Sequence, residues 1–390
     1  MTEAVVVSAA RTAIGRARKG TLANVDAFRL AEVAAAEALR RSRVPAELFD
    51  DFILAEAYQG GGVIGRNVAV RLGWSTLPGA AVNRHCAGGL SAVTTAAAGI
   101  RAGMDSVVLA GGTESMSTTP ATGRLDADGT FHRWMSEPNP GTPEAPAFDM
   151  PLTVGENTAR HMGLTRRDVD EWAVYSQAQA LASIDGGYFT EQIVGVDVPQ
   201  PDGSTIRFDT DEHPRRGTTL EVLAKLPVIH RELPDATVTA GNSAGLNDAA
   251  AAVTLTSDEF ARAHGLAPLA RIRSWAVAGI EPALTGMAPT IAIPKALDRA
   301  GLAISDIDLF EINEAFCSVP VAAVRKLGLD PSRVNVNGSG SSLGHPIAAT
   351  GTRMLVTMVY ELRRRGASLG CISMCAAGGM GAALVVEAVA

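Results

Sequence analysis

The chain has 390 residues, of which 47% are hydrophobic and 5% aromatic, so it is long enough to bury a large core. Its formal net charge of −7 gives it no general attraction for nucleic acid or anionic membranes. No apolar run reaches the length of a membrane span, and the start lacks the order of a signal peptide. Four cysteines are too few for a disulfide framework in a chain of this length, so we expect reduced thiols and a cytoplasmic protein.

The predicted elements form two similar series, one in each half of the chain. The first series runs through a strand at 50–58, a helix ending near Gly73, a strand ending at Val82-Asn83, a helix from Cys86 to Gly103, and a strand at 106–112. The second runs through a strand at 306–316, a helix ending near Gly328, a strand ending at Val336-Asn337, a helix opening at Pro346 and ending at Gly366, and a strand at 369–379. Alternating strands and helices predict a duplicated α/β fold with parallel-rich sheets.

The segment between the two series has a different composition, rich in Pro, Gly, Thr and charged residues. It contains one strong helix at 165–180, where Thr165 and Asp168 resemble a capping box. We therefore divide the chain into an N-terminal half (1–118), a loop domain (119–246) and a C-terminal half (247–390). Loops on a rigid scaffold commonly carry substrate specificity.

Two reactive residues stand at predicted helix starts. Cys86 comes just before a helix, where unpaired N–H groups favour a thiolate, and Gly88-Gly89 leaves room for a ligand. His345 precedes Pro346, which we expect at the first helical position, so that the ring lies near the N-cap and stays neutral. Taken singly, each is more often a core or capping residue. Together they form the pair that nucleophilic catalysis requires.

Two further residues have no reactive counterpart in the other half. Cys375 ends the last long strand, and its thiolate could take a proton from a carbon beside a thioester carbonyl. Asn313 could donate its amide to an oxyanion, although it could also be an ordinary turn residue. A metal site is not expected, because zinc usually requires four close ligands in paired spacings.

Seven motifs, in order along the chain, resemble the thiolase family over nearly its whole length. They are Ser8-Ala-Ala-Arg-Thr-Ala-Ile-Gly15, Asn83-Arg-His-Cys-Ala-Gly-Gly-Leu90, Ala110-Gly-Gly-Thr-Glu-Ser-Met-Ser117, Thr239-Ala-Gly-Asn-Ser-Ala-Gly-Leu-Asn-Asp248, Asn313-Glu-Ala-Phe316, Gly344-His-Pro346 and Cys375-Ala-Ala-Gly-Gly-Met-Gly381. The resemblance implies a five-layer αβαβα fold with internal duplication and an inserted loop domain. It also implies cleavage of 3-ketoacyl-CoA by CoA, or the reverse Claisen condensation.

The resemblance assigns roles to individual residues. Cys86 becomes acylated after His345 activates it, and Cys375 exchanges the α-proton. Asn313 holds a water that forms one oxyanion hole with His345, and the N–H groups of Cys86 and Ala377 form the other. Arg215, Ser243 and Ala244 are carried over as contacts to coenzyme A, which is a substrate and not a permanently bound cofactor. A homodimer or homotetramer, and partner enzymes of β-oxidation, are implied in the same way.

The chain departs from the family pattern at Gly88, Ala244 and Ala377, where the family commonly has Ser, Ser and Gly. The segment 148–156 also lacks the His-Met-Gly of biosynthetic acetoacetyl-CoA thiolases, which favours a degradative 3-ketoacyl-CoA thiolase. The alternatives are a biosynthetic thiolase, a decarboxylating ketosynthase-like enzyme, or an altered protein that only binds acyl-CoA. Asn313 and Cys375 argue against the ketosynthase, and Asn313 against the sterol-carrier type, which has histidine there.

Overall fold

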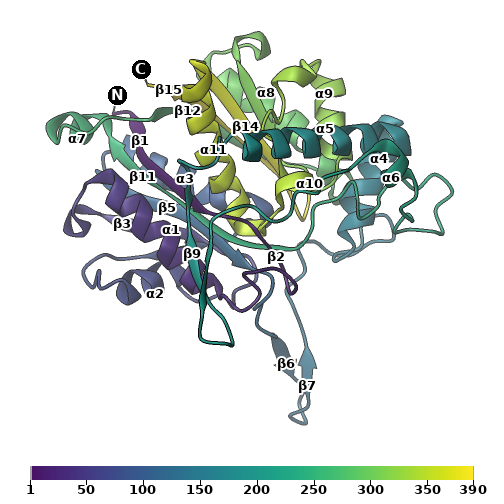
Figure 1. The fold of residues 1–390 in the computed structure, drawn as a ribbon, viewed down its shortest axis with the longest axis horizontal. Helices are drawn as coiled ribbons and strands as arrows, with labels where there is room; N and C mark the ends of the chain where they lie inside the picture. The colour runs from purple at the N-terminus through teal and green to yellow at the C-terminus, as the bar shows by residue number, and fades with distance from the viewer. Residues whose placement is uncertain (1, 390) are drawn as a thin grey trace.

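The computed structural model describes residues 2–389 and is built around one eleven-stranded sheet (Figure 1). Nine strands form a continuous path, listed here in spatial order: β13 (Leu309–Ile312), β14 (Leu369–Ala376), β15 (Met380–Ala388), β12 (Ala270–Gly279), β1 (Ala4–Thr12), β11 (Asn247–Ser257), β5 (Val107–Ser115), β3 (Asp51–Ala55) and β4 (Ala80–Val82). Two short strands lie off this path, with β2 (Gly15–Arg16) on β11 and β8 (Ile193–Val194) on β1. The sheet therefore contains strands from both the N-terminal and the C-terminal parts of the chain.

The sheet consists of two equivalent halves. The order β3-β5-β11-β1 in one half matches β13-β14-β15-β12 in the other, and the two are joined where Val5 and Val6 of β1 pair with Arg271 and Ala270 of β12. The parallel pairs β3–β5 and β13–β14 correspond as well. The predicted duplication is thus confirmed. Because β11 pairs with β1 and β5, residues 247–257 lie in the first half of the sheet, and our division at 247 stays a prediction.

Alternate side chains of the strands face two different helix layers. On β5, Val108 and Ala110 contact the central core, which holds α3 (Gly88–Arg101) and α11 (Thr350–Arg365) and also includes residues of β14 and β15. Val107 and Leu109 of β5 instead face an outer core with α1 (Ala27–Ser42) and α2 (Ile64–Arg71). A second outer core packs α8 (Pro289–Ala300) and α9 (Ser318–Leu327) on the other half-sheet. The order helix, sheet, helix, sheet, helix confirms the predicted five layers.

The two central helices approach each other through glycines at their N-terminal ends. A Cβ at Gly89 would lie 2.7 Å from the carbonyl oxygen of Ala348 and 2.7 Å from the backbone nitrogen of Thr352. A Cβ at Gly351 would lie 2.5 Å from the backbone nitrogen of Leu90. These contacts are backbone to backbone and leave no room for a side chain. The glycines therefore set the spacing of the two halves.

The structure differs from the sequence predictions at two points in the second half. No strand forms at Val336-Asn337, because Asn335 has a left-handed backbone conformation with φ 53°. Its side-chain amide makes the hydrogen bonds to β13 that a neighbouring strand would make, accepting from Ile312 N (2.7 Å) and donating to Ile312 O (2.8 Å). Pro346 does not open the long helix either. Gly344 has φ 109°, α10 (Gly340–Leu343) precedes it, and the turn η7 (Ile347–Ala349) separates Pro346 from α11.

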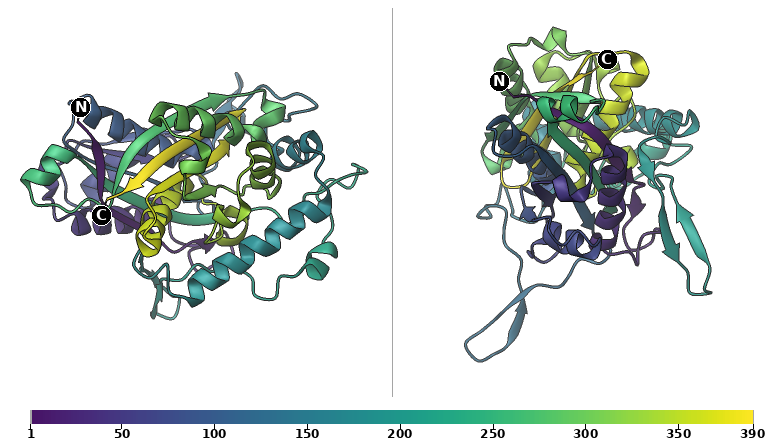
Figure 2. Two further views of the ribbon diagram at one scale, coloured as in Figure 1. Left: turned by 90° about the horizontal axis from the view of Figure 1, so that it is seen from above. Right: turned by 90° about the vertical axis from the view of Figure 1, so that its left-hand side faces the viewer.

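The region 119–246 contains several separate pieces. The predicted helix is present as α5 (Arg166–Asp185), and its capping box of Thr165 and Asp168 is confirmed. The other pieces are the π-helical turn η3 (Pro151–Glu156), α4 (Asn157–Met162), α6 (Leu220–Ala224), the hairpin of β9 (Val196–Pro199) with β10 (Thr205–Phe208), and the hairpin of β6 (Gly123–Leu125) with β7 (Phe131–Arg133). Figure 2 shows the β6–β7 hairpin projecting far from the layered core.

The remaining short elements connect the layers. They are η1 (Ala46–Leu48), η2 (His85–Ala87), α7 (Asp258–Ala263), η4 (Pro282–Met287), η5 (Ile304–Asp306) and η6 (Pro331–Arg333). Among residues 2–389, no helix combines the length and hydrophobicity that crossing a bilayer requires.

We expect Gly89→Ala to lower the free energy of unfolding by about 1–3 kcal/mol, since its methyl group would meet backbone atoms that cannot move freely. Gly279→Ala is the matched control, because a Cβ there has nothing within 4 Å. Chemical denaturation of both variants measures the difference. Equal stability of the two variants would contradict the proposed backbone contact.

Candidate active site

Cys86 lies in the turn η2, which leads directly into α3. The residue before it, His85, has φ 45°, a conformation that is sparsely populated for residues with side chains and is often found at functional turns. The pKa of the Cys86 thiol is raised to about 11. Burial is the largest cause of this rise and the charge of Glu114 adds to it, whereas the backbone N–H groups of Ala377 and of Cys86 itself lower the pKa. Cys86 is therefore a protonated thiol at neutral pH.

His345 is buried beside Cys86's turn, since η7 contacts η2. Its backbone N–H donates to Asn247 Oδ1 at 2.9 Å, which fixes the loop before η7. Burial, followed by the positive charge of Arg353, lowers the pKa of His345 to about 3. Our expectation of a neutral ring agrees with this pKa, but the cause is burial and not the N-cap position that we predicted.

The hydrogen bonds of the His345 ring assign its tautomer. The Thr350 hydroxyl donates to the carbonyl oxygen of Pro346 at 3.1 Å, so it accepts at 2.6 Å from Nδ1 of His345. Nδ1 then carries the proton, and the lone pair of Nε2 faces the Nδ2 amide of Asn313 at 3.4 Å. A neutral imidazole with a free Nε2 lone pair is the form that accepts a proton from a nucleophile.

Asn313 follows β13 and is completely buried. Its backbone N–H donates to Ser373 O at 2.9 Å, and its Oδ1 has no hydrogen-bond partner among residues 2–389. The next residue, Glu314, holds this segment in place. Its carboxylate accepts from Trp172 Nε1 (2.8 Å), Ser176 Oγ (2.6 Å), Asn335 Nδ2 (2.7 Å) and the backbone nitrogen (3.2 Å) and hydroxyl (2.7 Å) of Ser341.

Cys375 and Ala377 come from the end of β14, which contacts η2. Cys375 is 2% exposed, and burial, together with the nearby Cys86, raises the pKa of its thiol well above the ordinary value. The backbone N–H of Ala377 lies close enough to the Cys86 thiol to lower its pKa. The structure thus brings Cys86, Cys375 and Ala377 together, with His345 and Asn313 hydrogen-bonded to each other nearby.

The three predicted contacts to coenzyme A lie in two different places. Ser243 is buried and its hydroxyl donates to Thr239 O at 2.6 Å, while the N–H of Ala244 donates to Ala315 O at 3.0 Å. Both residues therefore adjoin the segment that carries Asn313. Arg215 is exposed, and its backbone N–H donates to Gln177 Oε1 at 2.9 Å. The assignment of these residues as ligand contacts stays a prediction.

The altered position Gly88 is tightly enclosed. A Cβ there would lie 3.1 Å from Cβ of Ala55 and 3.6 Å from Cβ of Ala348. A side chain at 88 would therefore press on the strand end of the first half and on the loop after His345.

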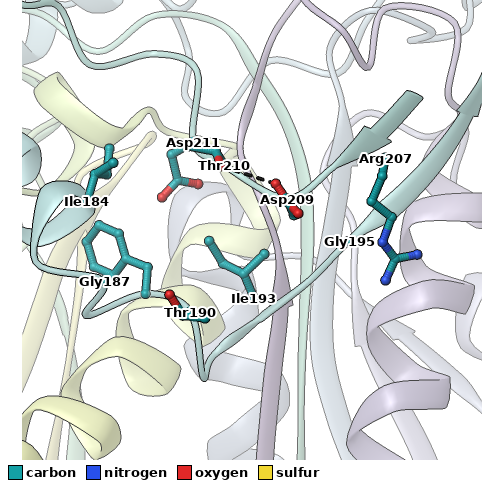
Figure 3. A pocket seen from close by; sticks show the side chains of 10 residues that line it. Ile184, Gly187, Thr190, Ile193, Gly195, Arg207, Asp209, Thr210 and Asp211 are labelled. Atoms are coloured by element: carbon teal, nitrogen blue, oxygen red, sulfur yellow. Dashed lines mark hydrogen bonds between the residues drawn. The ribbon is translucent and has the colours of Figure 1, made fainter.

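A cavity of about 330 Å³ lies away from these residues, beneath the β9–β10 hairpin (Figure 3). Its lining includes Phe189, Asp209 and Asp211, and Asp211 is bound to the fully buried Arg11 at 2.8 Å. None of the predicted catalytic residues lines it. Within residues 2–389, no group of three or more His, Cys, Asp or Glu side chains is arranged to hold a metal ion.

Four residues of the site escaped the sequence analysis as individual residues. Glu114, Asn247 and Glu314 fall inside the quoted motifs, so their place in those motifs was a signal, but their partners are distant in the chain. Thr350 had no signal, because its contact to His345 depends on the turn between Pro346 and α11.

The fold and the match to known families together define an acyltransferase. The model of the N-terminal thiolase domain matches residues 4–259, and that of the C-terminal thiolase domain matches residues 266–388. The chain therefore belongs to the thiolase family and is an acyltransferase.

Individual relatives match along the full chain. An acetyl-CoA acetyltransferase of Pseudomonas aeruginosa is 41% identical over 396 residues, with 99% of each chain covered. A 3-ketoacyl-CoA thiolase of Bacillus subtilis is 40% identical, covering 99% of this chain and 100% of its own. The crystal structure of human mitochondrial 3-ketoacyl-CoA thiolase in complex with CoA superposes with a TM-score of 0.90 at 36% identity, covering 100% of this chain and 98% of its own.

The alkylation of Cys86 by iodoacetamide should accelerate about tenfold for each pH unit between pH 7 and 9, because the thiolate fraction grows in this proportion below the pKa. Peptide mass spectrometry measures the rate, and the buried Cys317, Cys371 and Cys375 are internal controls that should react more slowly in the native protein. A rate that is already constant above pH 7 would indicate a preformed thiolate and contradict an uncharged Cys86 thiol beside an uncharged His345 ring.

Proposed function

We propose that the chain cleaves 3-ketoacyl-CoA with free coenzyme A, giving acetyl-CoA and a shortened acyl-CoA. The observation that carries the proposal is the position of the Cys86 thiol, which lies close to Cys375 and to the backbone N–H groups of Cys86 and Ala377 that lower its pKa. One cysteine is thus placed to hold an acyl group beside two oxyanion donors. The other is placed to handle the proton of the acetyl fragment.

The proposed cleavage has two balanced steps. Nε2 of His345 takes the proton of Cys86, whose sulfur attacks the keto carbon, and the bond between C2 and C3 then breaks. The proton on C2 of the departing acetyl-CoA comes from Cys375, whose thiolate is restored to a thiol by the incoming coenzyme A. The sulfur of that coenzyme A then attacks the acyl-Cys86 thioester and releases the shortened acyl-CoA, and the departing Cys86 sulfur takes back the proton from Nε2 of His345.

Two oxyanion sites serve these steps. The N–H groups of Cys86 and Ala377 are placed for the oxygen of the tetrahedral intermediate on Cys86. His345 and Asn313, which lie 3.4 Å apart between Nε2 and Nδ2, are placed for the enolate oxygen of acetyl-CoA through Nε2 and a water on Asn313. Each donor of this kind typically contributes on the order of 3 kcal/mol to the rate.

The direction of the reaction and the acyl chain are part of the proposal. The relatives carry both names, acetyl-CoA acetyltransferase and 3-ketoacyl-CoA thiolase. We favour degradation of 3-ketoacyl-CoA over the biosynthetic condensation because residues 148–156 read Phe-Asp-Met-Pro-Leu-Thr-Val-Gly-Glu. The human relative's complex with CoA supports coenzyme A as the substrate here. Its contacts in this chain are proposed to be Arg215, Ser243 and Ala244. The cytoplasm and the enzymes of β-oxidation are the proposed setting.

The wild-type protein should consume acetoacetyl-CoA or longer 3-ketoacyl-CoA in the presence of free coenzyme A, as followed by loss of the ketothioester absorbance. Cys86→Ser should lose activity by about 10³-fold or more, because the nucleophile is gone. Cys375→Ser should still gain the acyl mass on Cys86 but should not turn over.

Cys371→Ser is the matched control, since Cys371 lies on the same face of β14, is fully buried, and belongs to the packed outer core. It should keep activity within about threefold of wild type. No thiolysis of any chain length by folded wild-type protein would contradict the proposal and favour an acyl-CoA-binding role.

We also propose a homodimer or homotetramer. The segment around the β6–β7 hairpin carries large apolar side chains that the single chain leaves exposed: Leu125 (70%), Phe131 (58%), Trp134 (40%) and Met135 (41%). The hairpin also projects away from the core in Figure 1 and in the right-hand view of Figure 2. A group of exposed apolar residues on a projecting hairpin is typical of an interface.

The double variant Leu125→Ser, Phe131→Ser should shift the protein toward a smaller assembly, because these two side chains supply most of the exposed apolar surface of the hairpin. Light scattering after size exclusion at several concentrations measures the mass. Exposed Val70→Ser, on α2, is the control. An unchanged mass in the double variant would remove the hairpin from the interface.

A further inference from the structure

Glu114 is a buried acid next to the nucleophile that the proposed mechanism does not use. It lies near the end of β5 with 0% exposure, and no Lys, Arg or His among residues 2–389 forms an ion pair with it. Its charge is met only by N–H donors. Oε1 accepts from Tyr58 N (3.1 Å) and Gln59 Nε2 (2.5 Å), and Oε2 accepts from Ala57 N (3.1 Å) and Ala348 N (3.2 Å).

These donors come from both halves of the duplicated fold. Residues 57–59 directly follow β3 of the first half, whereas Ala348 belongs to η7 of the second half and lies three residues after His345. One carboxylate thus joins the loop that carries the base to the strand ends around the nucleophile. Glu314 holds the segment of Asn313 in the second half in a similar way, although it follows β13 and its counterpart by position in the first half is Glu56, which follows β3.

The charge of Glu114 also acts on its neighbours. Glu56, Tyr58 and Cys86 are the titratable groups that face it, and all of them are acids. Burial is the largest influence on Glu114 and raises its pKa to about 7, although the N–H donors lower it and Glu56 adds to the rise. The same charge raises the pKa of Cys86 and that of Tyr58.

We propose that Glu114 is a positioning residue for acyl transfer, which joins the His345 loop to the segment after β3 and places a negative charge near the Cys86 thiol. The inference rests on the proposed thiolase reaction. Both oxygens of Glu114 accept from two N–H groups each, so an amide in place of the carboxylate would turn its own NH₂ group toward N–H donors.

The charge and the hydrogen bonds can be separated with two variants. Glu114→Gln removes the charge and places a donor against donors, whereas Glu114→Asp keeps the charge but draws the carboxylate back by one methylene. The control is Glu56→Gln, because Glu56 is also buried next to this segment but accepts from Gln59 N (2.7 Å) and does not reach the loop of His345.

Two measurements are made on each variant: the rate of Cys86 alkylation by iodoacetamide at pH 8, and kcat with KM for thiolysis. In Glu114→Gln the alkylation rate should rise about threefold or more, which corresponds to half a pH unit in the thiol pKa, while kcat falls about tenfold. In Glu114→Asp kcat should fall similarly, but the alkylation rate should stay within about twofold of wild type. Glu56→Gln should leave both values near those of the wild type.

A structural role alone would slow turnover without this difference between Gln and Asp. The proposal is overturned if Glu114→Gln leaves alkylation and kcat unchanged, or if Asp and Gln raise alkylation equally. If Glu114→Gln does not fold, the Asp variant still tests whether the hydrogen bonds of Glu114 position the His345 loop. An unchanged kcat in Glu114→Asp would exclude that role. Alkylation needs no turnover, so a wild type without thiolysis would contradict the proposed function while the alkylation rates still test Glu114.

Discussion

The contact between the ends of α3 and α11 is the constraint on which the rest of the site depends. Gly89 and Gly351 let the two helix starts meet backbone to backbone, and Gly112 of β5 comes equally close, since a Cβ there would lie 2.1 Å from Ala348 O. Cys86 lies just before one helix and His345 just before the turn that leads into the other. The turns that carry Cys86 and His345 thus lie next to each other because the two helix starts touch at glycines.

Buried carboxylates then hold the loops that leave these contacts. Glu314 collects donors from α5, α10 and the loop at Asn335, and Glu114 collects donors from the segment after β3 and from η7. Neither forms an ion pair with a cationic side chain among the described residues, so their charge is balanced by hydrogen bonds alone. Such buried acceptors are costly when a donor is lost, which makes the loop positions specific.

The same burial determines the protonation states of the catalytic pair. A thiol with a pKa of about 11 and an imidazole with a pKa of about 3 leave both groups uncharged at neutral pH. In the proposed mechanism the proton of Cys86 moves as the sulfur attacks, toward the Nε2 lone pair of His345, whose ring Thr350 orients through Nδ1. The backbone N–H groups of Cys86 and Ala377 lower the pKa of the thiol and so favour its negative charge.

The sequence by itself determined the duplication, because strand and helix periodicity and the repeated glycine turns are local properties, and its resemblance to the thiolase family predicted the five layers. It predicted the capping of α5 correctly for the same reason. The predicted strand at Val336-Asn337 was wrong, because the side chain of Asn335 takes the hydrogen bonds that strand pairing would make. The predicted helix start at Pro346 was also wrong, because Gly344 has a positive φ and the long helix begins only after the turn that follows. Only the tertiary structure decided the tautomer of His345, the pKa of Cys86 and the role of Glu114, because each depends on donors and burial contributed by residues far away in the chain.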